Sequence, residues 1–107
     1  MSSPDLEQLM EQAREAQPRL AALQRELATR RVEGSAGGDM VVAVVSGDLR
    51  VLEIRFEDGL LEAGDRAMLQ DLTAAAVNAA LANAQRMIQQ EMQQASGSLP
   101  LPGLGPA

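Results

Sequence analysis

The sequence predicts an α+β fold in which a long N-terminal helix, a three-stranded antiparallel sheet and a long C-terminal helix follow one another. Three observations lead to this prediction. Apolar residues recur at alternating three- and four-residue steps near the start of the chain, β-branched runs separated by glycine-containing turns occupy the middle, and a long alanine-rich stretch follows. The length of 107 residues suits one domain.

The first helix is expected over residues 3–30. Ser3 is a suitable cap and Pro4 suits the first helical position. The apolar positions form an unbroken heptad seam, namely Leu6, Leu9, Ala13, Ala16, Leu20, Leu23 and Leu27. Such a seam predicts packing against another helix. Pro18 faces away from the seam, so we expect a kink and not a break. At 1.5 Å per residue the helix would be roughly 40 Å long, so part of it should protrude or pair with a second copy.

Three short strands are expected next, over residues 32–35, 40–45 and 49–56. Glycine-containing turns separate them, at Gly37-Gly38 and at Ser46-Gly47-Asp48. In the third strand Leu52, Ile54 and Phe56 share one face, whereas Val51 has the other parity, which predicts a β-bulge or burial on both faces. The result would be an antiparallel meander.

A connector, residues 57–61, leads to a second long helix over residues 63–95. Glu62 and Asp65 supply negative charge near its start, and the alanine-rich section from Thr73 to Ala84 permits close contact with another element. Residues 96–107 are rich in Gly, Pro and Ser and are predicted to be a disordered tail. We therefore expect one structured domain over residues 1–95.

Composition argues against an enzyme. The chain has no cysteine and no histidine, which excludes disulfides, thiolate zinc sites and histidine-based catalysis. No lysine is present to activate a serine or threonine nucleophile. The acidic residues near the second helix are explained by the connector and the helix start, so we expect no metal, no cofactor and no small-molecule substrate. No apolar run approaches the ~20 residues of a membrane span, and we expect a cytoplasmic protein.

The charges are unevenly distributed along the first helix. The net charge of the chain is −6, and all nine basic residues are arginines. Residues 19–31 hold four arginines and one glutamate, a net charge of +3, whereas residues 4–17 hold one arginine and four acids, a net charge of −3. Guanidinium groups bind phosphate oxygens, so the basic window predicts contacts with the DNA backbone. The residues nominated for DNA binding are Arg19, Arg25, Arg30, Arg31, Arg50 and Arg55.

Some of these arginines also have an explanation that does not involve DNA. Arg30 and Arg31 suit the negative end of the helix dipole, and arginines on strands such as Arg50 and Arg55 are commonly solvated. No aromatic residue accompanies the arginines, which makes base stacking on single strands improbable. Contact with the backbone of duplex DNA, with low sequence specificity, is the expectation.

Several motifs resemble the YbaB/EbfC family. Val32-Glu33-Gly34, followed by Gly37-Gly38-x-Met40-Val41, resembles one family signature, and Leu9-Met10-x-Gln12-Ala13 is typical of its first helix. The segment from Met68 to Leu81 resembles the second-helix motif, and the pattern extends without a gap from about Leu6 to Met92. The chain departs from it where the family usually has a third glycine (Asp39), a proline (Gly59) and strand lysines (Val42, Asp48, Leu52).

The resemblance implies a tweezer-like homodimer with protruding helices, associated with the bacterial nucleoid and lacking enzymatic activity. The residues expected at the dimer interface are Leu20, Leu23, Leu27, Val41, Val45, Leu72 and Ala76. An alternative, favoured by the net charge and the missing lysines, is a dimeric adaptor protein of the same fold with little or no affinity for DNA.

Overall fold

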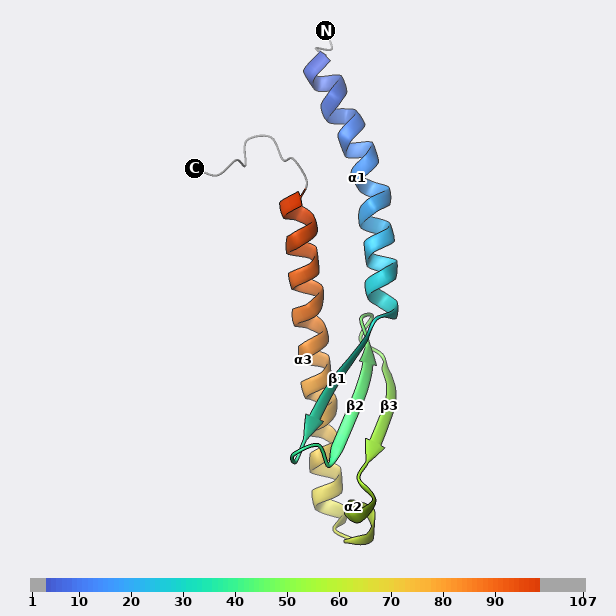
Figure 1. The fold of residues 1–107 in the computed structure, drawn as a ribbon, viewed down its shortest axis with the longest axis vertical. Helices are drawn as coiled ribbons and strands as arrows, with labels where there is room; N and C mark the ends of the chain where they lie inside the picture. The colour runs from blue at the N-terminus through green and yellow to red at the C-terminus, as the bar shows by residue number, and fades with distance from the viewer. Residues whose placement is uncertain (1–3, 99–107) are drawn as a thin grey trace, which may run out of the picture.

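The computed structural model describes residues 4–98 and confirms the predicted order of helix, three strands and helix (Figure 1). The long elements are α1 (Pro4–Thr29) and α3 (Arg66–Ser98), and the strands are β1 (Arg31–Ala36), β2 (Val41–Ser46) and β3 (Val51–Phe56). The molecule is elongated, with principal extents of 74 × 28 × 15 Å.

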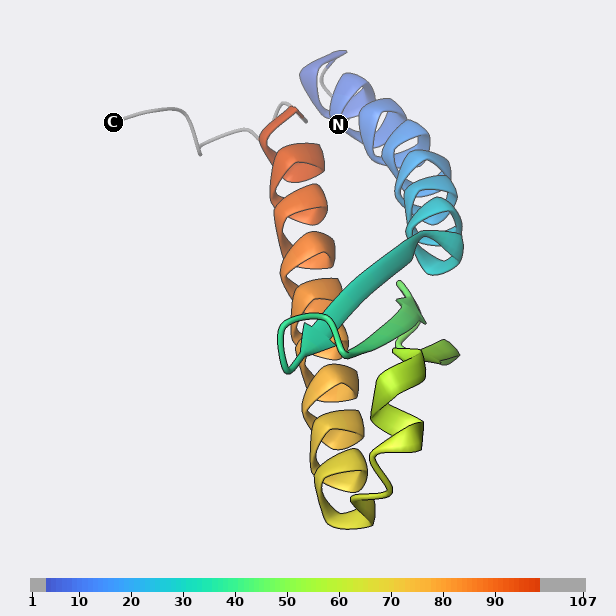
Figure 2. The ribbon, with the colours of Figure 1, turned by 60° about the horizontal axis from the view of Figure 1, so that its bottom comes forward.

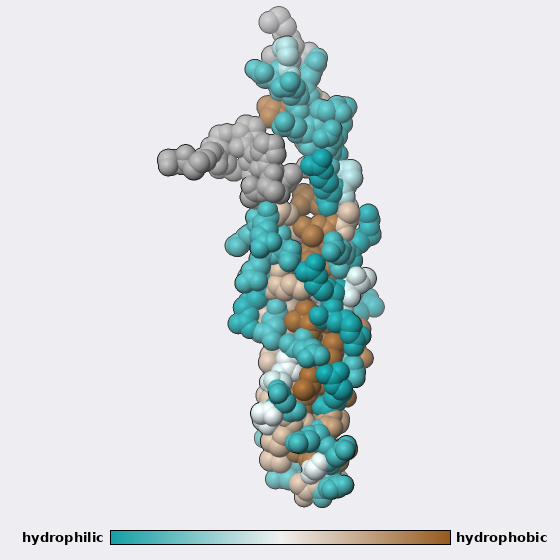
Figure 3. All heavy atoms as spheres, in the orientation of Figure 1, coloured by the Kyte–Doolittle hydropathy of each residue, from teal (hydrophilic) through white to brown (hydrophobic). Residues whose placement is uncertain are grey.

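Helix α1 forms an arm that projects from the body made by the sheet and α3 (Figures 1 and 2). It runs without interruption through Pro18, and Leu27 in its last turn is its buried residue. The protrusion predicted from the helix length is therefore confirmed. On the face seen in Figure 3, hydrophilic residues cover most of the arm, whereas apolar residues gather along the middle of the body.

The three strands form an antiparallel sheet in the order β1-β2-β3. Of the two alternatives expected for β3, the structure shows a bulge: Val44 pairs with Glu53 but Val45 pairs with Val51, so Leu52 is the extra residue. Three successive residues in the β1–β2 turn have positive φ, and the third is Asp39 at φ 72°. This left-handed conformation favours glycine, and aspartate is among the few other residues that tolerate it.

The core lies between the inner face of the sheet and α3. Val41, Ala43 and Val45 alternate onto that face of β2, and the period-four stripe Ala76, Ala80, Ala84 faces them from the helix. Small residues allow the backbones to approach closely. A Cβ atom on Gly34 of β1 would lie 2.1 Å from the backbone nitrogen of Ala80.

Some boundaries differ from the prediction. The segment predicted as a plain connector contains a short helix, α2 (Asp58–Glu62), so Glu62 belongs to α2 and not to the start of α3. Asp65 caps α3, because its Oδ1 accepts a hydrogen bond from the backbone N–H of Met68 at 3.0 Å. Helix α3 continues to Ser98, three residues beyond its predicted end, and the rest of the predicted tail, residues 99–107, lies outside the described residues.

Candidate nucleic-acid interface

Two of the six nominated arginines stand free on the arm. Arg19 and Arg25 are exposed on α1, and within residues 4–98 neither has a carboxylate at ion-pair distance. They are about 9 Å apart along the helix axis. Their guanidinium groups are therefore available to an external anion.

A third exposed arginine lies on the same helix and was not nominated. Arg14 precedes Arg25 by eleven residues, which is three helical turns, so the two share a face of α1. The charge window hid it, because Glu11 and Glu15 make its surroundings acidic. The eleven-residue spacing was the signal that could have revealed it.

Arg30 joins the arm to α3. Its Nη1 donates a hydrogen bond to Oε1 of Glu91 at 3.1 Å, and its Nη2 lies 3.3 Å from Oε1 of Glu26. The hydrogen bond to Glu91, before the other contributions, raises the pKa of the Arg30 guanidinium above its usual value. Both ends of this guanidinium are thus engaged by carboxylates of the same chain.

Arg31 and Arg55 belong to an ionic quartet on the outer face of the sheet, which we define as Arg31, Glu33, Glu53 and Arg55. Arg31 pairs with Glu53 at 3.0 Å, and Arg55 pairs with Glu33 at 3.1 Å and with Glu53 at 3.3 Å. Hydrogen bonds to Glu33 and then to Glu53 raise the pKa of Arg55. The quartet carries no net charge.

The quartet bridges the two edge strands across β2. In the register of the sheet Val44 lies between Glu33 and Glu53, on the face turned away from α3. Its exposure is only 1%. Arg31 and Arg55 are therefore paired with carboxylates of the same chain. Arg50 is likewise paired, at 3.4 Å from Asp48, although it is highly exposed.

Four of the seven residues expected at the dimer interface are already buried inside the chain. Val41, Val45 and Ala76 have no exposed surface and Leu27 has almost none, so the fold packs these four residues within the single chain. Leu72 is partly buried and lies against the β1–β2 turn, where its methyl groups approach Gly37. Leu20 and Leu23 are half-buried on α1 and keep surface that a partner could cover.

A different apolar surface is uncovered, and it lies between β3 and α3. The helix packs over β1 and β2, which leaves the inner side of β3 open. Val51, Leu52 and Ile54 of this strand are between 36% and 48% exposed. Beside them is a hollow of about 600 Å³, which we call the β3–α3 hollow, lined by Phe56, Leu69, Gln70, Thr73, Ala74, Val77 and Asn78.

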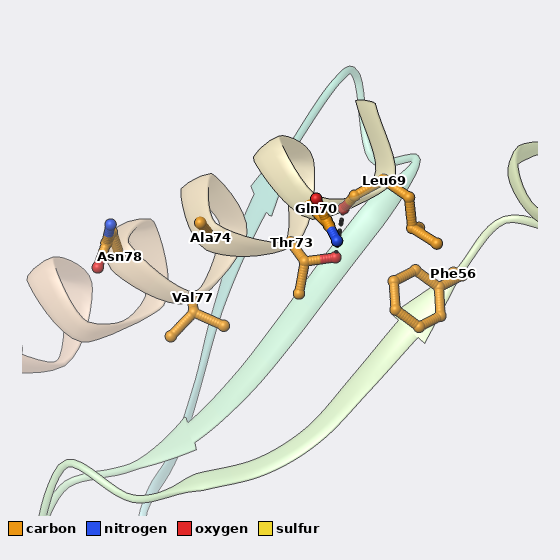
Figure 4. A pocket seen from close by; sticks show the side chains of 7 residues that line it. All are labelled: Phe56, Leu69, Gln70, Thr73, Ala74, Val77 and Asn78. Atoms are coloured by element: carbon orange, nitrogen blue, oxygen red, sulfur yellow. Dashed lines mark hydrogen bonds between the residues drawn. The ribbon is translucent and has the colours of Figure 1, made fainter. Parts of the chain in front are cut away.

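The β3–α3 hollow is apolar and its polar groups do not converge. Figure 4 shows the ring of Phe56 facing Leu69 and Thr73, with Val77 further along the same side of α3. The hydroxyl of Thr73 donates to the backbone oxygen of Leu69 at 2.6 Å, so it is satisfied within the helix. Such a surface suits an apolar partner and offers little to a polar substrate.

The described residues were also compared with the requirements of a metal site and of a membrane span. Over residues 4–98 no three acidic side chains gather closely enough to hold a metal ion. Within the same range no helix is both long enough and apolar enough to cross a membrane. The fold and its surface define a class of small α+β proteins that present a charged helical arm and an uncovered apolar face.

Comparisons with known proteins show the family to which the chain belongs. The model of the YbaB/EbfC DNA-binding family matches residues 1–99. A nucleoid-associated protein of Desulfotalea psychrophila is 43% identical over 100 residues, covering 94% of each chain. Another, of Syntrophobacter fumaroxidans, is 44% identical over 95 residues, covering 89% of this chain and 86% of its own length. The chain belongs to the YbaB/EbfC DNA-binding family, as its motifs predicted.

A solved structure supports the fold. The crystal structure of an uncharacterized protein from Helicobacter pylori superposes with a TM-score of 0.65 at 18% identity, covering 88% of this chain and 96% of that one. At this level of identity the likeness concerns the arrangement of helices and strands.

Proposed function

We propose that this protein is a nucleoid-associated protein that works as a homodimer and binds duplex DNA through phosphate contacts made by its helical arms. One observation carries the proposal: Arg19 and Arg25 are exposed and unpaired on a projecting helix, within residues 4–98. Membership of a DNA-binding family supports DNA as the ligand. The nucleoid of a bacterial cell is the corresponding location, in line with the names of the relatives.

Dimerisation would compensate for the acidity of the single chain. A net charge of −6 opposes the approach of a polyanion, so contact must depend on local groups of arginines. Two copies present two arms, and each arm contributes its own free guanidinium groups. Because these groups recognise phosphate and no aromatic residue accompanies them, sequence specificity should be low.

We assign the dimer contact to the β3–α3 hollow and the open side of β3. This surface combines exposed apolar side chains with the unpaired edge of a sheet, both of which favour association. Leu20 and Leu23 remain candidates for its margin.

The test of DNA binding is a fluorescence titration of a labelled duplex at several salt concentrations. Arg19→Ala/Arg25→Ala should weaken binding about tenfold or more at low salt and reduce the slope of log K against log salt. Arg66→Ala, which removes one positive charge at the opposite end of the molecule (Figure 1), is the matched control for each of the two single variants. Equal affinity of the double variant and the wild-type protein would overturn the phosphate-contact mechanism.

The test of dimerisation is the mass of the protein in solution. Ala74 is exposed and lines the hollow, so Ala74→Glu should give a folded monomer by placing a charge in the contact. Ala67→Glu, at an exposed position that does not line the hollow, should leave the mass unchanged. A wild-type protein that stays monomeric at micromolar concentration would contradict this proposal.

The adaptor alternative retains one specific support. The distal half of the arm carries Asp5, Glu7, Glu11 and Glu15, a charge pattern that repels DNA and suits a basic protein partner. Stoichiometric capture of a protein, together with no duplex binding at low salt, would favour this function over the first.

A further inference from the structure

The arm is attached to the body by a narrow base. Leu27 is buried there, and the backbone N–H of Gly47 donates to the carbonyl of Arg30 at 3.0 Å. A Cβ atom on Gly47 would lie 1.7 Å from the carbonyl oxygen of Leu27, so the β2–β3 turn lies directly against the end of α1. These contacts form a pivot.

A pivot alone does not determine where the tip of the arm lies. Residues 4–15 of α1 are all exposed, so the distal part of the helix has little support from the body. The helix is about 39 Å long, and a rotation of ~10° at its base would displace the tip by ~7 Å. Whatever sets the angle at the base therefore sets the positions of Arg19 and Arg25.

An ionic bridge at the base joins α1 to α3 and can set this angle. Arg30 holds Glu26 of α1 through one nitrogen and Glu91 of α3 through the other. The side chains of Arg30 and Glu91 are 39% and 33% exposed, so water screens their pair less than it would a fully exposed one. The planar guanidinium fork constrains direction as well as distance.

We propose that Glu91 is a positioning residue of the DNA interface, which acts through Arg30 to hold the arm at the angle required for phosphate contact. The inference rests on the proposed function. Arg30 changes role as a consequence: it is a structural strut and not a phosphate ligand. A phosphate could bind Arg30 only by displacing carboxylates that already occupy both ends of the guanidinium.

The sign of one substitution separates this proposal from simple electrostatics. Glu91→Gln removes a negative charge, which by itself should strengthen binding to a polyanion. If Glu91 positions the arm, the same change should weaken DNA binding by roughly three- to tenfold at low salt. Glu15→Gln is the matched control: it makes the same chemical change one helical turn from Arg19, within a Debye length, and should strengthen binding.

A double-mutant cycle tests the pairing. Under the proposal Arg30→Gln weakens binding, Glu91→Gln weakens binding, and the double variant is no weaker than the worse single one, because both changes break the same bridge. If Arg30 instead contacts phosphate, Arg30→Gln weakens binding, Glu91→Gln strengthens it and the effects add. That second pattern overturns the proposal.

A measurement without DNA keeps this inference separate from the proposed function. The chain has no cysteine, so spin labels can be attached to single cysteines placed at Gln12 on the arm and Gln94 on α3, both exposed. With labelled chain diluted in unlabelled chain, Glu91→Gln should broaden or shift the distance distribution between the labels. A distance distribution identical to that of the wild type overturns the positioning role of Glu91. Failure of the wild-type protein to bind DNA overturns the proposed function, but the distances between the labels still show whether Glu91 holds the arm.

Discussion

The arm and the outer face of the sheet both carry arginines, but they use them differently. On the sheet Arg31 and Arg55 are paired with Glu33 and Glu53 across the central strand. On the arm neither Arg19 nor Arg25 forms an ion pair with a carboxylate over residues 4–98. In a sheet, residues distant in sequence become neighbours a few ångströms apart, whereas an isolated helix brings together only residues three or four positions apart. The same kind of side chain is thus paired within the chain in one region and unpaired in the other.

The largest expected effect is on the stability of the body, and it is produced by a substitution at Gly34. The body depends on a backbone contact there, because an added Cβ atom would meet the nitrogen of Ala80 at 2.1 Å. Gly34→Ala should lower the free energy of unfolding by about 3 kcal/mol, at the upper end of overpacking effects. Gly59→Ala should be tolerated, since nothing lies within 4 Å of the added atom. Urea unfolding followed by circular dichroism measures both, and similar midpoints would contradict the tight packing of β1 on α3.

The apolar residue beneath the quartet offers the next test. Val44→Ala should lower the free energy of unfolding by about 1–3 kcal/mol, because it removes two methyl groups from a closed site. Val42→Ala, one step along the same face but less buried, should cost less. Thermal unfolding checks the ranking, and a larger loss at Val42 would show that the quartet does not shield Val44.

A matched pair of arginine substitutions compares the two regions directly. Arg25→Gln should weaken duplex binding roughly three- to tenfold at low salt without changing the melting temperature. Arg55→Gln should lower the melting temperature slightly, by an amount that shrinks as salt is added, and leave duplex affinity nearly unchanged. The opposite assignment of effects would mean that the sheet, and not the arm, meets the DNA.

The smallest expected effect concerns the β2–β3 turn, to which the arm is attached. Leu49 has φ 64°, a left-handed conformation that strains a leucine. Leu49→Gly should raise the free energy of unfolding by about 0.5–1 kcal/mol, since relief of strain exceeds the added entropy of the unfolded chain. Calorimetry checks the sign, and a clear loss of stability would indicate that the exposed Leu49 side chain has a contact of its own.

The order of the elements followed from local chemistry, and so did several details. The period of the apolar residues separated helix from strand. The parity of Val51 indicated a bulge or burial on both faces, and the alanine-rich stretch indicated close contact with another element, which is β1. Each of these depends on residues near one another in the chain. The short helix α2 was missed because it has only five residues and holds a glycine.

The ion-pair partners of the arginines and the surroundings of the expected interface residues could not be predicted from the sequence. Net charge over a window cannot reveal that Arg55 meets a carboxylate 22 positions away, or that Arg30 meets one 61 positions away. An apolar pattern likewise marks Val41 and Val45 as residues that must be buried, but not what buries them. In this chain α3 covers them, and the uncovered surface is the β3–α3 hollow.

By itself, the sequence determined the two long helices, the strands and the family, because periodicity, turn residues and motif spacing are properties of neighbouring residues. The tertiary structure alone decided which guanidinium groups are free and which apolar face is open. Those outcomes depend on which distant residues the fold brings within a few ångströms of each other, and Coulomb attraction and apolar contact both act over that short range.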